Sequence, residues 1–579
     1  MTTDAGVRGI QVHDCYLVIE TAEGLAVIDQ HALHERVLYE QFKQRVLEGR
    51  VEQQNLLVPE TVELSAGEAA VVVESAELLG SLGFSIEAFG TNTVLVQAYP
   101  AMLKRPDFSE LLRDLAETLE QPGQSPQRRD ILESLLQMMA CKAAIKSGYR
   151  LSSEEMASLL EQSHLIDDAH HCPHGRPTAL VGATVFDGRG GRIDNGTVLF
   201  RDGKVVAVGD ASLATDGYDR IDGSGKFVTP GVIDIHSHLG DYPTPSVQAH
   251  SDGNEATSPM TPEVWAEHSV WPQDPGFTRA LANGGVTSLQ ILPGSANLTG
   301  GRSVTLKNVS ARTVQGMKFP GAPYGMKMAC GENPKRVYGG KGRMPSTRMG
   351  NFAVNRQMWL DAQAYDGKKR DLGKETLKGV LDGEILVHNH CYRADEMALV
   401  MDMAKEMGYK VTAFHHAVEA YKIGDLLREN DVCSAIWADW YGFKMEAYDG
   451  ILENAAFLQR EGACVVIHSD DENGIQRLNQ EAAKAQAAGR RIGIDIPDAE
   501  VVGWFTYNAA KAMGIAEMTG SLETGKMADV VLWNGDPLSV YSRPEKVWVD
   551  GALMFDAMDR KRRPVSDFEL GQPGEGDVK

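Results

Sequence analysis

The sequence predicts an α/β protein in which an N-terminal α+β domain precedes a (β/α)8 barrel that carries a small β-sandwich. Three observations support this fold class. The chain has 579 residues, which is more than one domain of ~100–200 residues accounts for. Near Thr178, Glu- and Leu-rich helical stretches give way to short β-rich runs broken by DG and GG turns. Beyond that point, apolar strands that end in His or Asp alternate with helices.

The composition restricts the classes of function. A net charge of −23 at pH 7 argues against an autonomous, strongly basic nucleic-acid binder. No apolar run reaches the ~18–20 residues of a membrane span, and MTTDAGVRGI lacks a signal-peptide h-region. We therefore expect a cytoplasmic protein without membrane contact. Seven scattered cysteines favour a reducing compartment and thiols that are used singly.

The change from helical stretches to short β-rich runs near Thr178 sets the expected domain boundary. No Gly/Ser-rich or Pro-rich linker marks it. We place a first domain at residues 1–178 and a second at 179–579. Within the second, we expect the barrel at about 231–515 and the sandwich at about 179–230 and 516–560, a division that follows from the family resemblance of this domain given below.

Two short segments of the first domain carry residue types that bind metals. YLVIETAEGLAVIDQ has the alternation of a hairpin and runs into HALHERVLYE, where His31 and Glu35 lie i, i+4 on one helix face. Much later, Cys172 and His174 alternate in an extended segment, so thiolate and imidazole project to the same side. A solvated helix face is the ordinary interpretation of the first pair, and the residues alone do not bring the two segments together.

The same segments resemble the C-terminal domain of endonuclease-type MutL mismatch-repair proteins. DQHALHERVLYE at 29–40, ACK at 140–142 and CPHGRP at 172–177 match that family's motifs in the same order. The resemblance implies a zinc/manganese nicking site in which Asp29 and Glu35 have catalytic roles. The metal ligands that it implies are His31, Glu35, Cys141, Cys172 and His174.

The MutL resemblance also implies partners. QNLLVP at 54–59 is similar to the family's sliding-clamp docking peptide, with Gln54, Leu57 and Pro59 as the contacts, and a strand entering a turn is the alternative. Homodimerisation is expected, with a sliding clamp and DNA as further partners. We expect the family's ATPase region and its C-terminal tail to be missing. The nicking site would then lack nucleotide-driven control and the tail that completes it in the family.

Polar residues gather where the apolar strands of the second domain end. Strands are expected in GVIDIHSH, GVTSLQILPG, YGMKMACGEN, GEILVHNH, YKVTAFHHAVEA, DVCSAIWADW and ACVVIHSDD. A (β/α)8 barrel builds its active site at the C-terminal ends of its strands. His236 and His238 alternate on the first strand, so both imidazoles can bind one ion. His390, His416 and Asp470 end later strands, and the series predicts a metal site.

This series resembles the amidohydrolase superfamily, in particular imidazolonepropionase-like hydrolases and metal-dependent dipeptidases, over about residues 179–560. PGVIDIHSH is similar to the opening strand, and HNHCYRADE and HHAVEAY to the fifth- and sixth-strand segments. That match selects His390 and His416 over His388 and His415, and SDD supplies Asp470. The implied cofactor is Zn²⁺, as one or two ions.

The number of ions depends on a bridging residue. Binuclear members of the superfamily use a carboxylated Lys or a Glu from the third or fourth strand. Lys327 lies in an apolar strand and Glu332 just beyond it. A desolvated Lys loses its proton more readily, which a carbamate requires, so we favour Lys327. A mononuclear site with Asp470 as base remains open.

Weaker signals concern the substrate. Trp440 and Lys444 lie in WADWYGFK at 437–444 and could wall a pocket, although aromatic residues at a barrel mouth often only pack the loops. Arg393 and the run PGSANLTGGRS at 293–303 could contact an anionic or amide group. We interpret four cysteines in or beside apolar runs as packing residues: Cys330, Cys391, Cys433 and Cys464.

The expected function is metal-dependent hydrolysis of a C–N bond in a small amide, cyclic amide or dipeptide-like substrate. Asp470 would orient the hydroxide and pass its proton to the leaving nitrogen. Deamination is the nearest enzymatic alternative. A competing class is a DNA-repair module in which residues 1–178 dimerise, dock on a clamp and nick DNA, with the hydrolase as a passenger. A third alternative is an accidental fusion without functional coupling.

Overall fold

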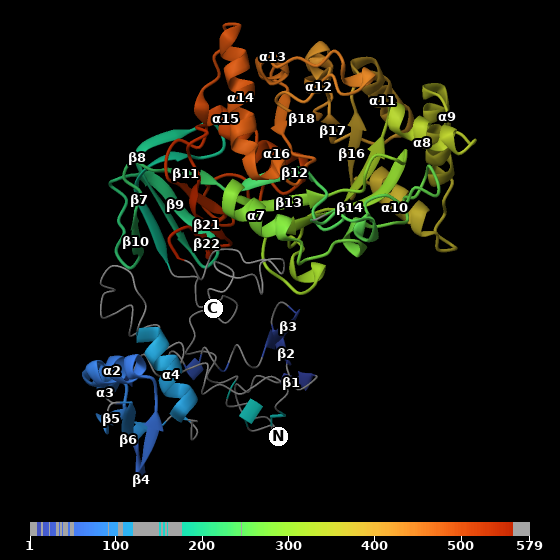
Figure 1. Cartoon of the computed structure of the whole chain (residues 1–579). Helices are drawn as coiled ribbons and strands as arrows, with labels where there is room; N and C mark the ends of the chain where they lie inside the picture. Colours follow the sequence, from blue (N-terminus) through green and yellow to red (C-terminus); the bar gives the residue numbers. More distant parts are fainter. Residues whose placement is uncertain are drawn as a thin grey trace. The chain divides into compact units, whose positions relative to one another are not determined.

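The structure is a computed structural model, and it divides the chain into two compact units, Met1–Pro173 and His174–Lys579 (Figure 1). The second unit is described almost throughout, the first in part. The described residues are 9–12, 16–21, 24–29, 34, 37–38, 45–46, 51–90, 92–101, 103, 108–119, 150–151, 155–156, 159, 177–244 and 246–559.

The first unit is α+β, as predicted. Two three-stranded antiparallel sheets are described: β1 (Gly9–Val12), β2 (Tyr16–Thr21) and β3 (Gly24–Asp29), and, in the order β4-β6-β5, β4 (Gln53–Glu63), β6 (Thr93–Pro100) and β5 (Ser85–Ala88). Its described helices are α2 (Ala66–Glu74), α3 (Ala76–Ser81) and α4 (Phe108–Leu119). A capping box starts α2, because Ser65 and Glu68 each accept the other's backbone N–H. Buried Val72, Val94 and Leu112 join the β4-β6-β5 sheet and its helices in one core.

The β-sandwich predicted at both ends of the second unit is present. Its strands are β7 (Thr178–Phe186), β8 (Arg192–Arg201), β9 (Lys204–Asp210), β10 (Asp219–Asp222), β11 (Phe227–Pro230), β20 (Val530–Trp533), β21 (Pro544–Val549) and β22 (Ala552–Asp556). Their order is β22-β21-β20-β11-β7-β8-β9, with β10 beside β7. The antiparallel pairing of β11 with β20 joins strands that precede the barrel to strands that follow it. Leu180, Phe200, Leu532 and Trp548 therefore share one core.

Eight strands form the predicted barrel sheet, in sequence order. They are β12 (Val232–Ser237), β13 (Val286–Ile291), β14 (Thr299–Lys307), β15 (Gly325–Ala329), β16 (Leu386–Cys391), β17 (Ala413–His416), β18 (Cys433–Ile436) and β19 (Cys464–Ile467). The two edge strands approach each other just past β19, where the Asp470 backbone N–H donates to the His236 carbonyl at 2.9 Å. The sheet is therefore a nearly closed barrel.

One strand departs from the expected alternation of strand and helix. β14 is antiparallel to both β13 and β15, whereas the remaining neighbours are parallel. Part of the run 293–303, which we expected to be able to contact an anionic or amide group, is the first half of this strand. The Arg302 guanidinium lies over the Trp265 ring at 4.2 Å and donates to Thr376.

Helices surround the barrel (Figure 1). The α-helices are α7 (Pro275–Gly284), α8 (Glu332–Gly340), α9 (Arg348–Gln363), α10 (Leu372–Leu381), α11 (Ala394–Met407), α12 (Gly424–Glu429), α13 (Asn454–Arg460), α14 (Leu478–Arg491), α15 (Asp498–Gly503) and α16 (Tyr507–Ala512). Short 3₁₀ turns are η2 (Gln248–His250), η3 (Ala266–His268), η4 (Val314–Gly316), η5 (Ala420–Lys422), η6 (Met445–Ala447) and η7 (Gly474–Arg477). Asp274 caps α7 ahead of Pro275, and Gly285 ends it at φ 66°. Among the described residues, no helix is long and apolar enough to cross a membrane.

Four cysteines of the barrel are paired, contrary to the interpretation as single packing thiols. Cys330 is bonded to Cys391 and Cys433 to Cys464. Each bond joins neighbouring strands: Cys433 and Cys464 are register partners on β18 and β19, with Cα atoms 4.5 Å apart. Spacing along the sequence does not reveal this register, which explains the error.

Candidate active site

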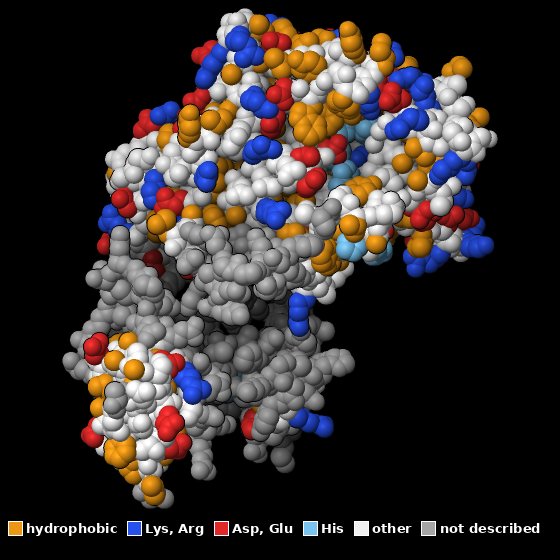
Figure 2. Space-filling model, in the orientation of Figure 1, with side chains coloured by type: hydrophobic (Ala, Val, Ile, Leu, Met, Phe, Trp, Pro, Cys, Tyr) orange, Lys and Arg blue, Asp and Glu red, His pale blue; other side chains and the backbone are white. Residues whose placement is uncertain are grey.

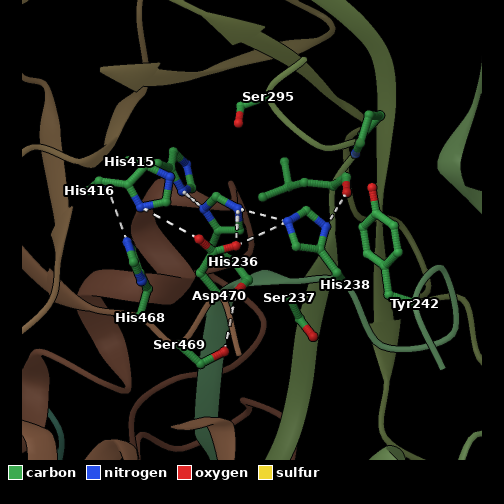
Figure 3. A network of polar contacts seen from close by, with 12 residues as sticks. His236, Ser237, His238, Tyr242, Ser295, His415, His416, His468, Ser469 and Asp470 are labelled. Atoms are coloured by element: carbon green, nitrogen blue, oxygen red, sulfur yellow. Dashed lines mark hydrogen bonds and ion pairs between the residues drawn. The ribbon is translucent and has the colours of Figure 1, made fainter. Parts of the chain in front are cut away.

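The centre of the site is formed by His236 on β12, by His238 directly after this strand and by Asp470, which follows β19 (Figure 3). The Asp470 Oδ1 atom lies 3.1 Å from His238 Nε2 and 3.3 Å from His236 Nε2. The two Nε2 atoms are 3.3 Å apart. His236 and Asp470 come from the first and last strands of the sheet, so near-closure of the barrel brings the three groups together. One nitrogen from each ring and a carboxylate oxygen converge on a single point.

Three more histidines extend this centre. His416 and His468 form a second convergent group with His236, and the His390 ring centroid lies 4.5 Å from that of His416. All three side chains are buried. Both ring nitrogens of His390 and Nδ1 of His416 and of His468 have no hydrogen-bond partner among the described residues. Buried, unpaired imidazole nitrogens beside a carboxylate are a donor set that suits a Zn²⁺-like ion.

Lys327 and Glu332 lie in different places. Lys327 is fully buried on β15, with Nζ 3.3 Å from His236 Nε2 and 2.9 Å from the Pro293 carbonyl. Burial lowers the pKa of Lys327 to about 8. Glu332 begins α8, and its carboxylate lies 3.9 Å from Lys444 Nζ. The structure therefore brings Lys327, and not Glu332, into contact with the histidine cluster.

Burial and neighbouring charges set the protonation of the cluster. Burial, with nearby Lys327 and the neighbouring histidines, holds the pKa values of His236 and His416 well below the usual range. The same causes, together with Lys444, act on His390. Burial alone would raise the pKa of Asp470, but the hydrogen bond from His238 and nearby positive charge lower it overall. Neutral imidazoles and an ionised carboxylate are the forms that bind metals.

A hydrogen-bonded chain of side chains inside the barrel supports His236. His236 Nδ1 is 2.9 Å from His415 Nδ1, His415 Nε2 is 3.0 Å from His388 Nδ1, and His388 Nε2 is 3.3 Å from Gln290 Nε2. His388 and His415, which were not among the predicted ligands, thus support a candidate ligand. Such contacts to the second ring nitrogen fix the tautomer and orientation of a ligating histidine.

A buried carboxylate ties the first strand to the last. Asp234 accepts the backbone N–H groups of His236 and Ser469, at 3.1 and 3.2 Å, and the Ser469 hydroxyl. Burial raises the pKa of Asp234 to about 7. The sequence did not single out Asp234 and Ser469. In IDIHSH and HSDD, the pattern of metal ligands is carried by the histidines and Asp470, and Asp234 and Ser469 are not part of that pattern.

The backbone is strained where the site residues leave the strands. His416, Ala417 and Asp470 have φ values of 72°, 39° and 58°, a region that non-glycine residues rarely occupy. Such conformations persist where the surrounding structure over-determines them, and they cluster at functional sites.

The three residues predicted to contact substrate, Trp440, Lys444 and Arg393, lie in different surroundings. Trp440 lies on the loop after β18, and its ring stacks at 5.5 Å on that of Trp437, which in turn stacks on His416. Lys444 Nζ lies 3.0 Å from Glu446 and 3.8 Å from the centre of the Tyr392 ring. Arg393 is paired with exposed Asp395 on its own segment, at 2.9 Å. The structure thus links Trp440 and Lys444 to the cluster through aromatic rings.

The predicted site of the first unit is largely outside the described residues. His31, Glu35, Cys141, Cys172 and His174 lie there, and Asp29 is described only as the last residue of β3. The residues predicted to dock on a clamp, Gln54, Leu57 and Pro59, lie on β4, where pairing with β6 is interrupted between Asn55 and Glu60. The side chains of Gln54 and Pro59 are exposed.

Family models match two stretches of the chain. Residues 10–151 match the MutL C terminal dimerisation domain, and residues 450–557 match the amidohydrolase family. An amidohydrolase from Thermotoga maritima MSB8 of known structure is 35% identical with a TM-score of 0.60, over 66% of this chain and all of its own.

Curated relatives divide in the same way. Amidohydrolase tasK of Hapsidospora irregularis is 32% identical over 398 residues, which are 62% of this chain and 40% of that protein. The DNA mismatch repair protein MutL of Phenylobacterium zucineum (strain HLK1) is 43% identical over 173 residues, which are 30% of this chain and 28% of that protein. The chain thus spans less than half the length of either relative.

Proposed function

This chain belongs to the amidohydrolase family and carries a MutL C-terminal domain, and from that premise we propose that it hydrolyses C–N bonds with the help of a bound metal. The substrate class we propose is a small amide, a cyclic amide or a dipeptide-like molecule. The observation that carries the proposal is the convergence of His236, His238 and Asp470 at one point, beside a buried set of unpaired imidazoles.

The donor set suits one or two Zn²⁺ ions. His236, His238 and Asp470 would hold the first, and His390 and His416 a second, with Lys327 as the bridging group in preference to Glu332. A bound ion of this kind supplies a Lewis acid and a water that loses its proton near neutral pH.

Asp470 is placed for proton transfer. Its carboxylate is one-quarter exposed, so it is the member of the cluster that is open toward an incoming substrate, together with His238. Its lowered pKa keeps the carboxylate ionised, and it accepts a hydrogen bond from His238. We propose that Asp470 takes a proton from the attacking water and passes it to the leaving nitrogen.

Substitution of Asp470 tests this role. We expect Asp470→Asn to retain bound metal and to lose about 10²- to 10⁴-fold in turnover, since the amide keeps an oxygen ligand but cannot take the proton. Metal content of the purified full chain and kcat on a panel of dipeptides and cyclic amides are the measurements. Asp366→Asn, an exposed aspartate paired with Lys368, is the control. Unchanged turnover in Asp470→Asn would contradict the role.

The first unit has a second candidate function as a dimerisation module that docks on a sliding clamp. The interruption of β4 favours it, because Val58 is 78% exposed within the peptide that carries Gln54, Leu57 and Pro59. An exposed apolar side chain next to such an irregular segment is available to a partner. We expect Val58→Asp to abolish binding of the full chain to an immobilised sliding clamp, while the sedimentation of the dimer is unchanged.

DNA nicking is a further alternative for the same unit, through Asp29, His31, Glu35, Cys141, Cys172 and His174. Relaxation of supercoiled DNA by the full chain in Mn²⁺, lost in His31→Ala and retained in Asp470→Asn, is the result expected for a nicking site that is independent of the barrel.

A further inference from the structure

A row of aromatic rings lies between the histidine cluster and solvent. The Trp437 ring stacks on His416, with centroids 4.3 Å apart and planes at 25°. Trp440 stacks on Trp437 at 5.5 Å, again at 25°. Exposure rises along this row from 2% at His416 to 8% at Trp437 and 41% at Trp440. The row therefore leads from a candidate metal ligand to the surface.

A second row runs beside the first. The Tyr392 ring lies 5.2 Å from that of His416, at an interplanar angle of 26°. Phe443 packs edge-on against both Tyr392 and Trp437, at 6.3 and 6.0 Å, and is 57% exposed. We call these four rings, Tyr392, Trp437, Trp440 and Phe443, the aromatic wall. Figure 2 shows histidine atoms reaching the surface of the larger unit beside a group of hydrophobic side chains.

Polar contacts hold the wall in place. The indole N–H of Trp437 donates to the Ser469 carbonyl at 2.9 Å. Buried Glu446 accepts from Arg348, from the Glu332 backbone N–H and from Lys444, at 2.9 to 3.0 Å. The loop after β18 is thus anchored to α8 and α9. Pre-organised rings bind a partner with less loss of conformational freedom.

Lys444, the cation that lies over two of these rings, is already paired with carboxylates. Lys444 Nζ lies between the Glu446 carboxylate at 3.0 Å and the Glu332 carboxylate at 3.9 Å, over the face of Tyr392. The wall therefore offers π faces and CH edges, and no unpaired positive charge within these contacts. Such a surface selects an uncharged planar or apolar group over a carboxylate.

We propose that the aromatic wall is a substrate subsite, and that the hydrolysed amide carries an aromatic or planar apolar substituent on the side of His416. The proposal rests on the proposed function, since it places the scissile group at the metal centre. The substituent would then cover the exposed faces of Trp440 and Phe443. The wall is continuous with the histidine cluster, which is the reason to assign it to substrate in preference to a second protein chain.

Binding of matched hydroxamates tests the subsite without turnover. Hydroxamates chelate metal ions, so 3-phenylpropanohydroxamate and propanohydroxamate present the same head group with and without a ring. For the Zn²⁺-loaded full chain in a titration calorimeter, we expect the phenyl compound to bind at least about tenfold tighter. Trp440→Ala and Phe443→Ala should reduce this ratio to about threefold or less and leave the affinity for propanohydroxamate unchanged.

The control variant is Tyr541→Ala, which removes a ring that is 89% exposed on the sandwich and should leave both affinities unchanged. A ratio near one in the wild type, or equal weakening of both compounds in Trp440→Ala, overturns the subsite and leaves the proposed hydrolase intact. Failure of both hydroxamates to bind overturns the metal centre and the subsite together. A change of sedimentation in Phe443→Ala with unchanged ratios would assign the rings to an interface between chains instead.

Discussion

His236 has both ring nitrogens engaged, and in opposite directions. Its Nε2 faces Asp470, His238 and Lys327, while its Nδ1 faces His415. The HxH spacing made His236 and His238 predictable, because alternate residues of a strand share a side. The supporting role of His388 and His415 could not be predicted: HNH and HH each offer two imidazoles, and the resemblance that selected His390 and His416 said nothing of the contacts between His388, His415 and His236.

Removal of the support of His236 is expected to weaken metal binding. We expect His415→Phe to lower the affinity for Zn²⁺ about 10- to 100-fold, because the His236 ring loses the partner that fixes its tautomer. His415→Asn retains a polar group near the Nδ1 position and should recover part of the loss. Competition with a chromogenic chelator measures the affinity. The control is His250→Ala, which replaces an exposed histidine. Wild-type affinity for Zn²⁺ in His415→Phe would contradict the positioning role of His415.

At the scale of elements, seven of the eight barrel strands could be predicted, and β14 could not. Strand-helix alternation identifies a parallel strand by the helix that follows it. β14 has no such helix, and its glycine-rich start in TGGRSVTLK reads as a loop. Because β14 runs against its neighbours, Ser303 meets Gly325 as a register partner across the β14–β15 pair. Next to Gly325, the barrel interior is filled by Ser303, Gln290 and His388.

Gly325 is the residue that makes room for this packing. A Cβ atom there would lie 2.3 Å from Ser303 Oγ, 2.7 Å from His388 Cδ2 and 3.1 Å from Gln290 Nε2. We expect Gly325→Ala to lower the free energy of unfolding of the second unit by about 1–3 kcal/mol through overpacking. The eight tryptophans of the sequence all follow residue 178, so their fluorescence in denaturant follows this unit.

Gly340→Ala is the matched control, since a Cβ at Gly340 meets nothing within 4 Å. It should leave the midpoint unchanged or raise it slightly, because alanine is the better helix residue. Equal midpoints for Gly325→Ala and Gly340→Ala would show that His388 and Gln290 move aside without cost.

At the scale of the whole molecule, the barrel and the sandwich are connected by an ion cluster in which Lys307 and Asp529 are buried and Asp550 is partly exposed. Lys307 at the end of β14 lies 3.0 Å from Asp529 and 2.8 Å from Asp550, next to the sandwich strands β20 and β22. The composition of the sequence indicated two domains, and its motifs indicated two families. No pattern in the sequence indicated this cluster, because Lys307 precedes both aspartates by more than 200 residues.

Loss of the cation of this cluster leaves a buried carboxylate without its partner. We expect Lys307→Met to lower the free energy of unfolding of the second unit by about 3–5 kcal/mol. Lys378→Met removes an exposed i, i+4 pair with Asp382 and should cost less than about 1 kcal/mol. Tryptophan fluorescence in denaturant measures both. A loss below 1 kcal/mol in Lys307→Met would mean that Asp529 finds compensation elsewhere, for instance from the Thr519 hydroxyl at 2.6 Å.

The sandwich also has a consequence for synthesis on the ribosome. Strands β7 to β11 are made first, yet their partners β20 to β22 emerge only after about 300 further residues. At ~5–20 residues per second, the nascent chain waits about 15–60 s before Val530 can pair with Pro230. During that interval the β11 edge and the apolar side chains of a half-built core are exposed to solvent. Slow translation across the barrel would lengthen this exposure.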